Sequence, residues 1–264
     1  MGNVSLLRKL RRRASAAVNV GLDHLSRRVP DLGLRDKPIA EWTALEGRLH
    51  GIRVPRGMRA KPPGPEGSAN INIIFDLLAR TRDVPGDVAE CGVFRGETLL
   101  AMALRLAQGQ PPSDKQVLGF DSFEGFDELV EVDKQLGGVD MVHKEVGGFR
   151  ETSYDQLLYK VRRWGLSDRV KLVPGYFNDT LEGYADRRFS FVHLDCDLYE
   201  SYKTCLEFFY PRLEPGAIVL LDEYNDPPWP GCNKAVDEFL ADKPETLRMA
   251  EADGYQKWFF RRAD

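Results

Sequence analysis

Two apolar runs of the chain, residues 189–194 and 217–221, each end on acidic side chains. The acids are Asp195 and Asp197 after the first run, and Asp222 and Glu223 after the second. Short runs rich in Val, Leu and Phe are typical of buried strands. Because ligands bind beyond the carboxyl ends of the strands in an open α/β sheet, the pattern predicts a carboxylate cluster at one edge of a sheet.

Asp195, Asp222 and Glu223 are the predicted ligands of a divalent cation. Carboxylate oxygens suit Mg²⁺ or Mn²⁺ and leave positions for water and a substrate. A hydroxyl group bound to such an ion has a lowered pKa and can become a nucleophile near neutral pH. Without a cation, three converging acids would repel one another and take up protons. Asp197 is expected to order the turn that follows, and His193, inside the strand, to be a core residue.

Residues 90–98, Glu-Cys-Gly-Val-Phe-Arg-Gly-Glu-Thr, have the composition of a ligand-binding turn between a strand and a helix. Gly92 and Gly96 would let a ligand approach the backbone, and the following helix offers free N–H groups. The third glycine of the dinucleotide fingerprint is absent, because Glu97 stands near its place. Glu90 and Glu97 suit an amine or sulfonium cation better than a pyrophosphate. Two glycines four residues apart also occur in simple tight turns.

Two later strand ends add to a predicted adenosyl site. Asp121 follows an apolar strand where an acid can accept hydrogen bonds from ribose hydroxyls; the alternative is that it initiates a turn. After the next strand, Phe177 could lie against an adenine ring, with Asn178 or Asp179 near its amino group. For Asp179 the alternative is the capped start of a helix.

The order of apolar runs and amphipathic segments predicts an α/β fold with a doubly wound, mainly parallel sheet. Strands are expected at residues 87–93, 116–120, 170–173, 189–194 and 217–221, with a final antiparallel pair at 246–250 and 256–261. Helices are expected at 97–107, 154–164, 201–213 and 234–240, after an earlier helix capped by Ser68. These elements form one seven-stranded domain, residues 69–264.

Two segments stand outside this pattern. Residues 123–153 hold two pairs of adjacent glycines and many acids, and so long a loop in a compact domain is typical of a lid. His143 within it is a candidate general base beside Asp195. Residues 1–68 are predicted to form a basic helix and a Pro/Gly-rich arm. The helix fits docking in a dimer, contact with an anionic surface or an organelle transit peptide.

Charge and cysteine usage limit the class of protein. The chain carries 37 Lys and Arg against 41 Asp and Glu, and this net charge of −4 argues against nucleic acid as the main partner. The four cysteines have no metal-finger spacing, so we expect free thiols in a reducing, cytoplasmic compartment. No apolar stretch approaches the roughly 18 residues that would suggest a membrane span.

Three other short motifs overlap the acidic region. Tyr199 and Lys203 match the Y-x-x-x-K of short-chain dehydrogenases, but they follow the fourth strand and the nucleotide glycine pattern is incomplete. Residues 218–223 resemble a Walker B strand without a Walker A loop before it. Asp195 and Asp197 form the D-x-D of Mn²⁺-dependent glycosyltransferases that use nucleotide sugars, which is an open alternative. A non-catalytic dimeric module of the same fold is another.

Five blocks of the chain resemble the macrocin O-methyltransferase (TylF) family of class I S-adenosylmethionine-dependent enzymes. The blocks are residues 90–96, 121–125, 174–181, 194–201 and 221–224, and Asp-Leu-Tyr-Glu-Ser at 197–201 is the most specific part. The resemblance implies a Rossmann-like class I methyltransferase sheet. It also implies Mg²⁺-dependent methylation of a sugar hydroxyl on a natural product such as a macrolide or aminocoumarin. Glu97 and Glu223 depart from the family's usual pattern.

The resemblance also implies roles for individual residues. Asp195, Asp222 and Glu223 would hold the metal. An acceptor hydroxyl would lose its proton to Asp195, Asp197, His143 or water, and then attack the methyl group of the cofactor. The candidate cofactor residues are Glu90, Gly92, Phe94, Arg95, Gly96, Asp121, Ser122, Phe177, Asp179 and Asp195. The expected partners are a small-molecule acceptor and further copies of the chain, in a homodimer or higher homo-oligomer.

Overall fold

The computed structural model describes residues 65–126, 132–133, 149 and 153–263. Residues 1–64 of the predicted arm, most of the predicted lid and the candidate base His143 lie outside these ranges. The described residues all belong to one compact unit, Glu41–Asp264. Within them, no helix is both long enough and apolar enough to cross a membrane.

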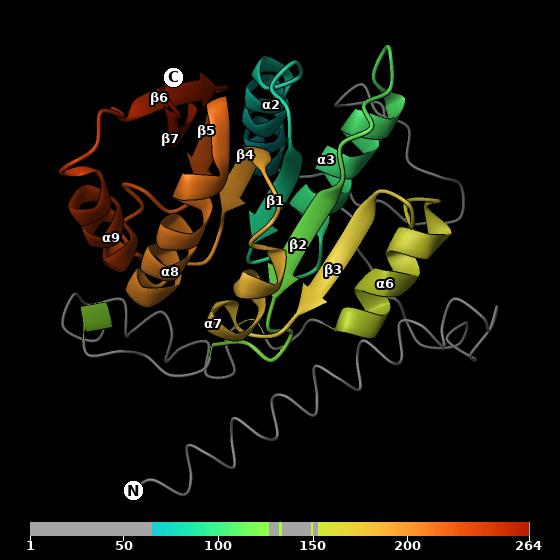
Figure 1. Ribbon diagram of the computed structural model, residues 1–264, viewed down its shortest axis with the longest axis horizontal. Coiled ribbons are helices and arrows are strands. Elements are labelled where there is room, and N and C mark those ends of the chain that lie inside the picture. The colour runs from blue at the N-terminus through green and yellow to red at the C-terminus, as the bar shows by residue number, and fades with distance from the viewer. Residues whose placement is uncertain (1–64, 127–131, 134–148, 150–152, 264) are drawn as a thin grey trace, which may run out of the picture. The chain divides into compact units, whose positions relative to one another are not determined.

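Seven strands form one sheet in the order β3-β2-β1-β4-β5-β7-β6 (Figure 1). The strands are β1 Asp87–Cys91, β2 Val117–Asp121, β3 Val170–Pro174, β4 Phe189–Leu194, β5 Leu213–Leu221, β6 Arg248–Ala252 and β7 Tyr255–Arg261. The first five pair in parallel, whereas β7 pairs antiparallel with both β5 and β6. The predicted doubly wound sheet with an antiparallel last pair is therefore confirmed.

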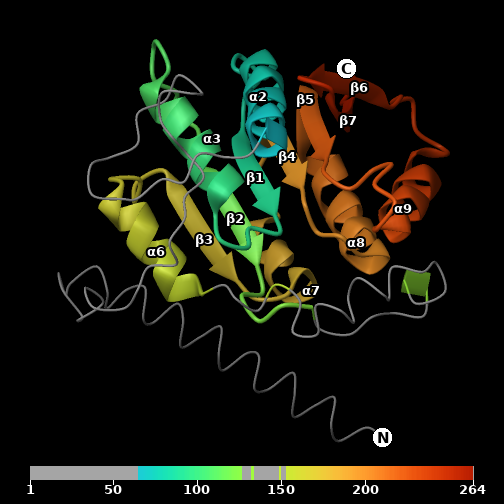
Figure 2. The same cartoon turned by 180° about the vertical axis from the view of Figure 1, so that it is seen from behind.

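Helices cover both faces of this sheet. They are α2 Pro65–Arg80, α3 Glu97–Gln108, α6 Tyr154–Arg163, α7 Phe177–Thr180, α8 Tyr199–Phe209 and α9 Pro230–Leu240, with the short 3₁₀ turns η2 Leu181–Tyr184 and η3 Tyr210–Arg212. Figure 1 shows α8 and α9 on the near side of the sheet, and Figure 2 shows α2 and α3 on the opposite side.

Alternating strand residues build two separate cores. Successive side chains of a strand point to opposite faces. Val88 and Val117 accordingly pack with α2, α3 and α6, whereas Ala89 and Leu118 pack with α8 and α9. Because both faces are covered, the parallel strands are largely apolar on both faces rather than on alternate residues only. This explains why the sequence shows runs of Val, Leu and Phe rather than an alternating pattern.

Several predicted element boundaries are wrong by a few residues; the strand expected from 217 begins at Leu213, and the helix expected from 234 begins at Pro230. The helix expected at 201–213 ends at Phe209, and Leu213 already begins β5, where it pairs with Phe189. The helix assigned a Ser68 cap begins at Pro65, a residue type that fits the first turn of a helix. Asp179 lies inside α7 rather than capping it, because that helix begins at Phe177.

The carboxyl ends of the parallel strands meet at one edge of the sheet, and the arrowheads of β1, β2 and β3 point to it in Figure 1. The chain runs outward from β1 through β2 to β3 on one side and from β4 to β5 on the other. The strand order thus reverses between β1 and β4. Open α/β sheets bind ligands at such a switch point.

Lys115 stabilises the opposite edge. Its Nζ donates to the carbonyl oxygen of Gly86 and to the hydroxyl of Ser190 at 2.9 Å each, and it also contacts the carbonyl of Val84. Burial lowers the pKa of Lys115, although the charge of Asp87 acts to raise it. This buried lysine therefore connects the amino ends of β1, β2 and β4, far from the predicted site.

Candidate cofactor and metal site

Three carboxylates meet at the carboxyl edge of the sheet, where the sequence predicts a cation site. Oxygens of Asp195, Asp222 and Glu223 all lie within 4.8 Å of one another. The pairing of Leu194 with Leu221 brings the ends of β4 and β5 together. Burial and the charges of neighbouring acids raise the pKa of both Asp195 and Glu223. A cation at this point would replace the protons that these acids otherwise attract.

Asp222 is held by a positive charge on each carboxylate oxygen. Nε2 of His193, on β4, lies 3.2 Å from Oδ1, and Nζ of Lys257, on β7, lies 2.7 Å from Oδ2. Lys257 also donates to the main-chain oxygen of Asp222 at 2.6 Å. Burial alone would raise the pKa of Asp222, but Lys257 and His193 outweigh it and hold that pKa well below its usual range. Asp222 is therefore ionised.

Glu223 is held from a helix instead. The hydroxyl of Tyr202, on α8, donates to Glu223 Oε2 at 2.5 Å, and the backbone N–H of Asp197 approaches the same oxygen at 3.4 Å. Asp197 adopts a φ of 62°, a positive value that is uncommon outside glycine. The D-x-D pair is thus divided, because the Asp195 carboxylate belongs to the cluster of three whereas the Asp197 carboxylate does not. Asp197 is nevertheless near, since burial and the charges of Asp195 and Asp222 raise its pKa.

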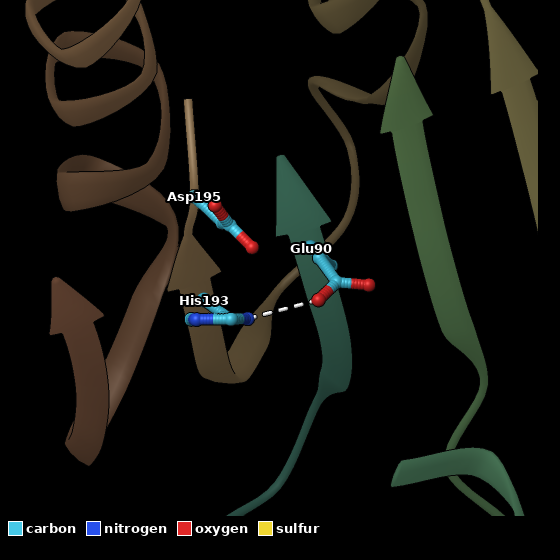
Figure 3. Close-up of side chains that lie close together, drawn as sticks. All are labelled: Glu90, His193 and Asp195. Carbon is cyan, nitrogen blue, oxygen red and sulfur yellow. Dashed lines mark hydrogen bonds and ion pairs between the residues drawn. The ribbon is translucent and has the colours of Figure 1, made fainter. Parts of the chain in front are cut away.

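Glu90 is a fully buried carboxylate next to this cluster. Its Oε1 accepts a hydrogen bond from His193 Nδ1 at 2.9 Å (Figure 3) and another from the hydroxyl of Thr98. Its Oε2 is buried and has no hydrogen-bond partner among the described residues. An unpaired carboxylate oxygen in the protein interior is costly. Glu90 is therefore suited to a cationic group bound beside β1.

His193 connects Glu90 to Asp222. Burial alone would lower the pKa of His193, but its hydrogen bonds to Asp222 and Glu90, and their charges, raise that pKa to about 10. Glu90, His193 and Asp195 also place ligand atoms within 4.8 Å of one another. However, both ring nitrogens of His193 are already engaged, so this second group is a poor metal site. His193 is buried, as the sequence predicts, but it bridges two acids as well.

Gly92 allows β1 to pack closely against the end of β4. It has a φ of 85°, and a Cβ built on it would lie 1.6 Å from the carbonyl oxygen of Asp195. The sequence assigned this space to an approaching ligand, but the chain itself fills it. A Cβ on Gly96 would similarly meet the side chain of Leu157 at 2.3 Å. Packing against main chain thus requires glycine at position 92, whereas at position 96 a Cβ would displace the end of a flexible side chain and the positive φ of 84° favours glycine.

Asp121 organises the same turn with its carboxylate. Oδ2 accepts the backbone N–H groups of Val93 and Phe94 at 2.8 Å each, and Oδ1 accepts that of Phe123 at 2.6 Å. Burial raises the pKa of Asp121, and these three bonds oppose the rise. The turn-forming role is therefore confirmed. Because each carboxylate oxygen can accept a second bond, the ribose role remains a prediction.

The remaining candidate cofactor residues follow the carboxyl ends of β1, β2 and β3. Phe94 has a φ of 46°, and the guanidinium of Arg95 lies 4.7 Å from its ring centroid. Ser122 donates to a carbonyl in its own turn at 2.8 Å. Beyond β3, Phe177 is partly buried and Asp179 is exposed. The sheet thus brings these residues to the edge that carries Glu90 and Asp195, which are themselves candidates.

Lys160 supports the turn from α6 and should make stability depend on pH. It is 3% exposed, and its Nζ donates to the carbonyl of Arg95 at 3.0 Å. Burial lowers its pKa to about 8, whereas an unfolded lysine titrates near 10.4. Between these values the unfolded chain binds more protons than the folded one. The free energy of unfolding should therefore rise with pH across this window.

Lys160→Met should remove this contribution. The difference in unfolding free energy between wild type and variant should shift by about 2 kcal/mol between pH 7.5 and pH 10, in favour of the wild type. Urea unfolding at several pH values would measure it. A constant difference would mean that Lys160 titrates like an exposed lysine.

Comparison with known proteins assigns the family. A model of the family described as macrocin O-methyltransferase (TylF) matches residues 70–262. The chain belongs to the macrocin O-methyltransferase family. The matched range contains the whole carboxylate cluster and the turn after β1, and it confirms the resemblance drawn from the sequence.

Two curated relatives are enzymes of natural-product modification. One is the 8-demethyl-8-(2,3-dimethoxy-alpha-L-rhamnosyl)-tetracenomycin-C 4'-O-methyltransferase of Streptomyces olivaceus, 36% identical over 65% of this chain and 64% of the relative. Another is the mycinamicin III 3''-O-methyltransferase of Micromonospora griseorubida, 32% identical over 59% of this chain and 61% of the relative. The chain thus aligns with just under two thirds of the length of each.

Solved structures support the fold. The O-methyltransferase NovP matches with a TM-score of 0.67 at 24% identity, covering 84% of this chain and 95% of NovP. The calicheamicin methyltransferase CalS11 matches with a TM-score of 0.62 at 25% identity, covering 74% of this chain and 79% of CalS11. The seven-stranded architecture of this chain therefore matches that of these two solved methyltransferase structures.

Sequence reasoning missed three residues that support the site: Thr98, Tyr202 and Lys257. One signal was present for Lys257, which stands two residues before Phe259 on the buried face of an otherwise aromatic strand. A lysine among buried aromatic residues almost always has a charged partner. No local pattern indicated Tyr202, because its partner Glu223 lies 21 residues further along the chain.

Proposed function

We propose that the protein is an S-adenosylmethionine- and Mg²⁺-dependent O-methyltransferase that acts on a sugar hydroxyl of a natural product or glycoside. One observation carries the proposal: the unpaired Oε2 of Glu90 lies at the same sheet edge as the cluster of Asp195, Asp222 and Glu223. An acid that needs a cationic ligand thus lies beside a group of acids that needs a metal ion. Family membership supports the same activity.

The chemistry of the β1 turn supports the cofactor assignment. S-adenosylmethionine carries an ammonium and a sulfonium group, and the buried Glu90 would pair with such a charge. Asp121 would accept the ribose hydroxyls, and the residues around Phe94, Ser122, Phe177 and Asp179 would surround the adenosine. A pyrophosphate in the same place would face the charge of Glu90, which argues against a nucleotide-sugar donor.

The carboxylate cluster supports the metal assignment. Asp195, Asp222 and Glu223 supply hard oxygen ligands of the kind that Mg²⁺ prefers, from two adjacent strand ends. The raised pKa values of Asp195 and Glu223 fit a site that is balanced by a cation. A bound divalent ion would supply Lewis-acid help by lowering the pKa of the acceptor hydroxyl.

The side chains of this chain then align the reactants and move one proton. Asp195 is the proposed proton acceptor, because it lies at the junction of the cofactor turn and the carboxylate cluster; His143, in the predicted lid, is the alternative. Asp195 would accept the proton of the acceptor hydroxyl, whose oxygen would bond to the methyl carbon as the carbon–sulfur bond breaks, and S-adenosylhomocysteine would leave. Orientation of this kind can lower the activation free energy by about 7–11 kcal/mol in favourable cases.

The two segments outside the sheet have proposed roles in recognition. The insertion at 123–153 would cover the site and select the acceptor. The arm at 1–68 would pack against a second copy of the chain. Analytical ultracentrifugation of the full chain and of a chain lacking the arm would test the second role, since loss of the arm should lower the oligomeric state.

Glu90→Gln should weaken binding of S-adenosylhomocysteine, which retains the ammonium group of the cofactor. We expect a loss of about tenfold or more, because hydrogen bonds to charged groups contribute about 1.5–3 kcal/mol. Isothermal titration calorimetry without metal or acceptor would measure it. Glu251→Gln is a matched control, since Glu251 is exposed on β6. Within the described part of the chain, its carboxylate accepts a hydrogen bond from the nearby Gln256 alone.

Several outcomes would contradict the proposal. Equal affinity of wild type and Glu90→Gln for S-adenosylhomocysteine would mean that the cofactor does not bind beside Glu90. Binding of a nucleoside diphosphate in place of S-adenosylhomocysteine would favour the glycosyltransferase alternative. Methyl transfer that persists unchanged in excess chelator, measured with labelled cofactor and a panel of glycosides, would exclude the metal requirement.

A further inference from the structure

We propose that His193, Tyr202 and Lys257 form a clamp that makes the metal site selective for Mg²⁺ over the larger Ca²⁺. The inference rests on the proposed function, because it assumes that Asp222 and Glu223 bind a divalent cation. It assigns the clamp residues a positioning role, since each contacts Asp222 or Glu223 and none is itself a proposed metal ligand. The clamp residues come from β4, α8 and β7.

The clamp restrains Asp222 at three points. Lys257 reaches Oδ2 at 2.7 Å and the main-chain oxygen at 2.6 Å, and His193 reaches Oδ1 at 3.2 Å. Rotation of the carboxylate would break one of these charged contacts. Lys257 is 4% exposed and His193 is fully buried, so water cannot easily replace either contact. Asp222 can therefore offer only the lone pairs that the clamp leaves unused.

Tyr202 restrains the neighbouring acid in the same way. It is fully buried, and its hydroxyl lies 2.5 Å from Glu223 Oε2 and 2.8 Å from the carbonyl oxygen of Leu194 at the end of β4. Two consecutive acids are thus held from opposite sides by core residues. The distance between their free lone pairs is set by the packing of the sheet and α8 rather than by the ion.

A rigid oxygen site discriminates between ions by size. Mg²⁺ requires near-octahedral ligands at about 2.0–2.1 Å and keeps several waters, whereas Ca²⁺ takes six to eight ligands at about 2.3–2.6 Å. A carboxylate that can rotate adapts to Ca²⁺ by binding through both oxygens. Asp222 and Glu223 cannot do so while the clamp engages both carboxylate oxygens of Asp222 and one of Glu223. The clamp should therefore disfavour Ca²⁺ specifically.

Comparison of the two ions separates this geometric effect from charge. The ammonium of Lys257 repels any divalent ion, so its removal changes both affinities in the same direction. Mg²⁺ and Ca²⁺ carry equal charge, and the ratio of their dissociation constants largely cancels that effect. Displacement of Mn²⁺ by Mg²⁺ and by Ca²⁺, followed by electron paramagnetic resonance of the free Mn²⁺, gives both constants without cofactor, acceptor or turnover.

The wild type should bind Mg²⁺ about tenfold or more tightly than Ca²⁺. In Lys257→Met the ratio of the Ca²⁺ to the Mg²⁺ dissociation constant should fall close to one, because residues that orient metal ligands affect affinity by about 10–100-fold. Tyr202→Phe should also lower this ratio of dissociation constants, without changing any charge. It tests the clamp independently if Lys257→Met does not fold. Lys115→Met is the matched control. It removes another buried lysine, at the opposite edge, and should lower stability while the ratio stays at the wild-type value.

Two results would overturn the inference in distinguishable ways. If Lys257→Met and Tyr202→Phe bind both ions with altered affinity but an unaltered ratio, these residues act through charge or stability alone and the clamp is wrong. If the wild type fails to bind Mn²⁺ while it binds S-adenosylhomocysteine, the metal part of the proposed function fails and the clamp fails with it.

Discussion

Asp195→Asn is expected to lower kcat for methyl transfer by about a thousandfold, the middle of the range for loss of a positioned acid or base. The substitution removes a charge from the carboxylate cluster and the proposed proton acceptor in one step, with almost no change of shape. Affinity for S-adenosylhomocysteine should stay within a few-fold, because Glu90 and Asp121 remain. Labelled methyl transfer to an acceptor found in a glycoside panel would measure kcat, and calorimetry the affinity.

Asp197→Asn is the matched control for this variant. Asp197 is the other acid of the D-x-D pair, but its carboxylate is not among the three that meet within 4.8 Å, and its main-chain N–H approaches Glu223. Asparagine tolerates the positive φ of 62° at this position well. Turnover within a few-fold of the wild type is expected. Equal losses for the two variants would mean that the pair acts as one unit, as in the glycosyltransferase alternative.

Gly92→Ala should destabilise the fold by more than about 4 kcal/mol, which is exceptional for one methyl group. The added Cβ would lie 1.6 Å from the carbonyl oxygen of Asp195, so β1 and the end of β4 would have to separate. The positive φ of 85° adds a further cost of about 1–2 kcal/mol. Urea unfolding at one pH would measure the change.

Gly165→Ala separates the two causes. Gly165 also has a positive φ, 68°, but a Cβ there meets nothing within 4 Å. This variant should lose only the backbone cost of about 1–2 kcal/mol. Similar losses at the two positions would mean that the β1 turn moves aside without penalty, and the close approach of Gly92 to Asp195 would then not matter for stability.

The fold was predictable because its central strands are buried on both faces. Apolar runs such as residues 189–194, bounded by turn residues, identify strands without knowledge of their neighbours. Boundaries near residue 213 were not predictable in the same way. Leu213 continues the apolar pattern of α8, and only its pairing with Phe189 across the sheet makes it part of β5.

In the candidate site, too, the residues were predictable but their contacts were not. Residue types and their place after strands were enough to group Asp195 with Asp222 and Glu223, because parallel strands end at a common edge. The contacts that hold those acids depend on pairs far apart in the chain. His193 meets Glu90 across 103 residues, and Lys257 meets Asp222 across 35.

The sequence by itself determined the family, the sheet and the acids that line its edge, since these follow from local patterns of apolar and charged residues. Tertiary structure alone decided that Gly92 accommodates the main chain of Asp195. It also decided that Lys257 and His193 contact the two carboxylate oxygens of Asp222. The physical reason is that burial and hydrogen bonding depend on which strands become neighbours, and strand order is not a property of any one segment.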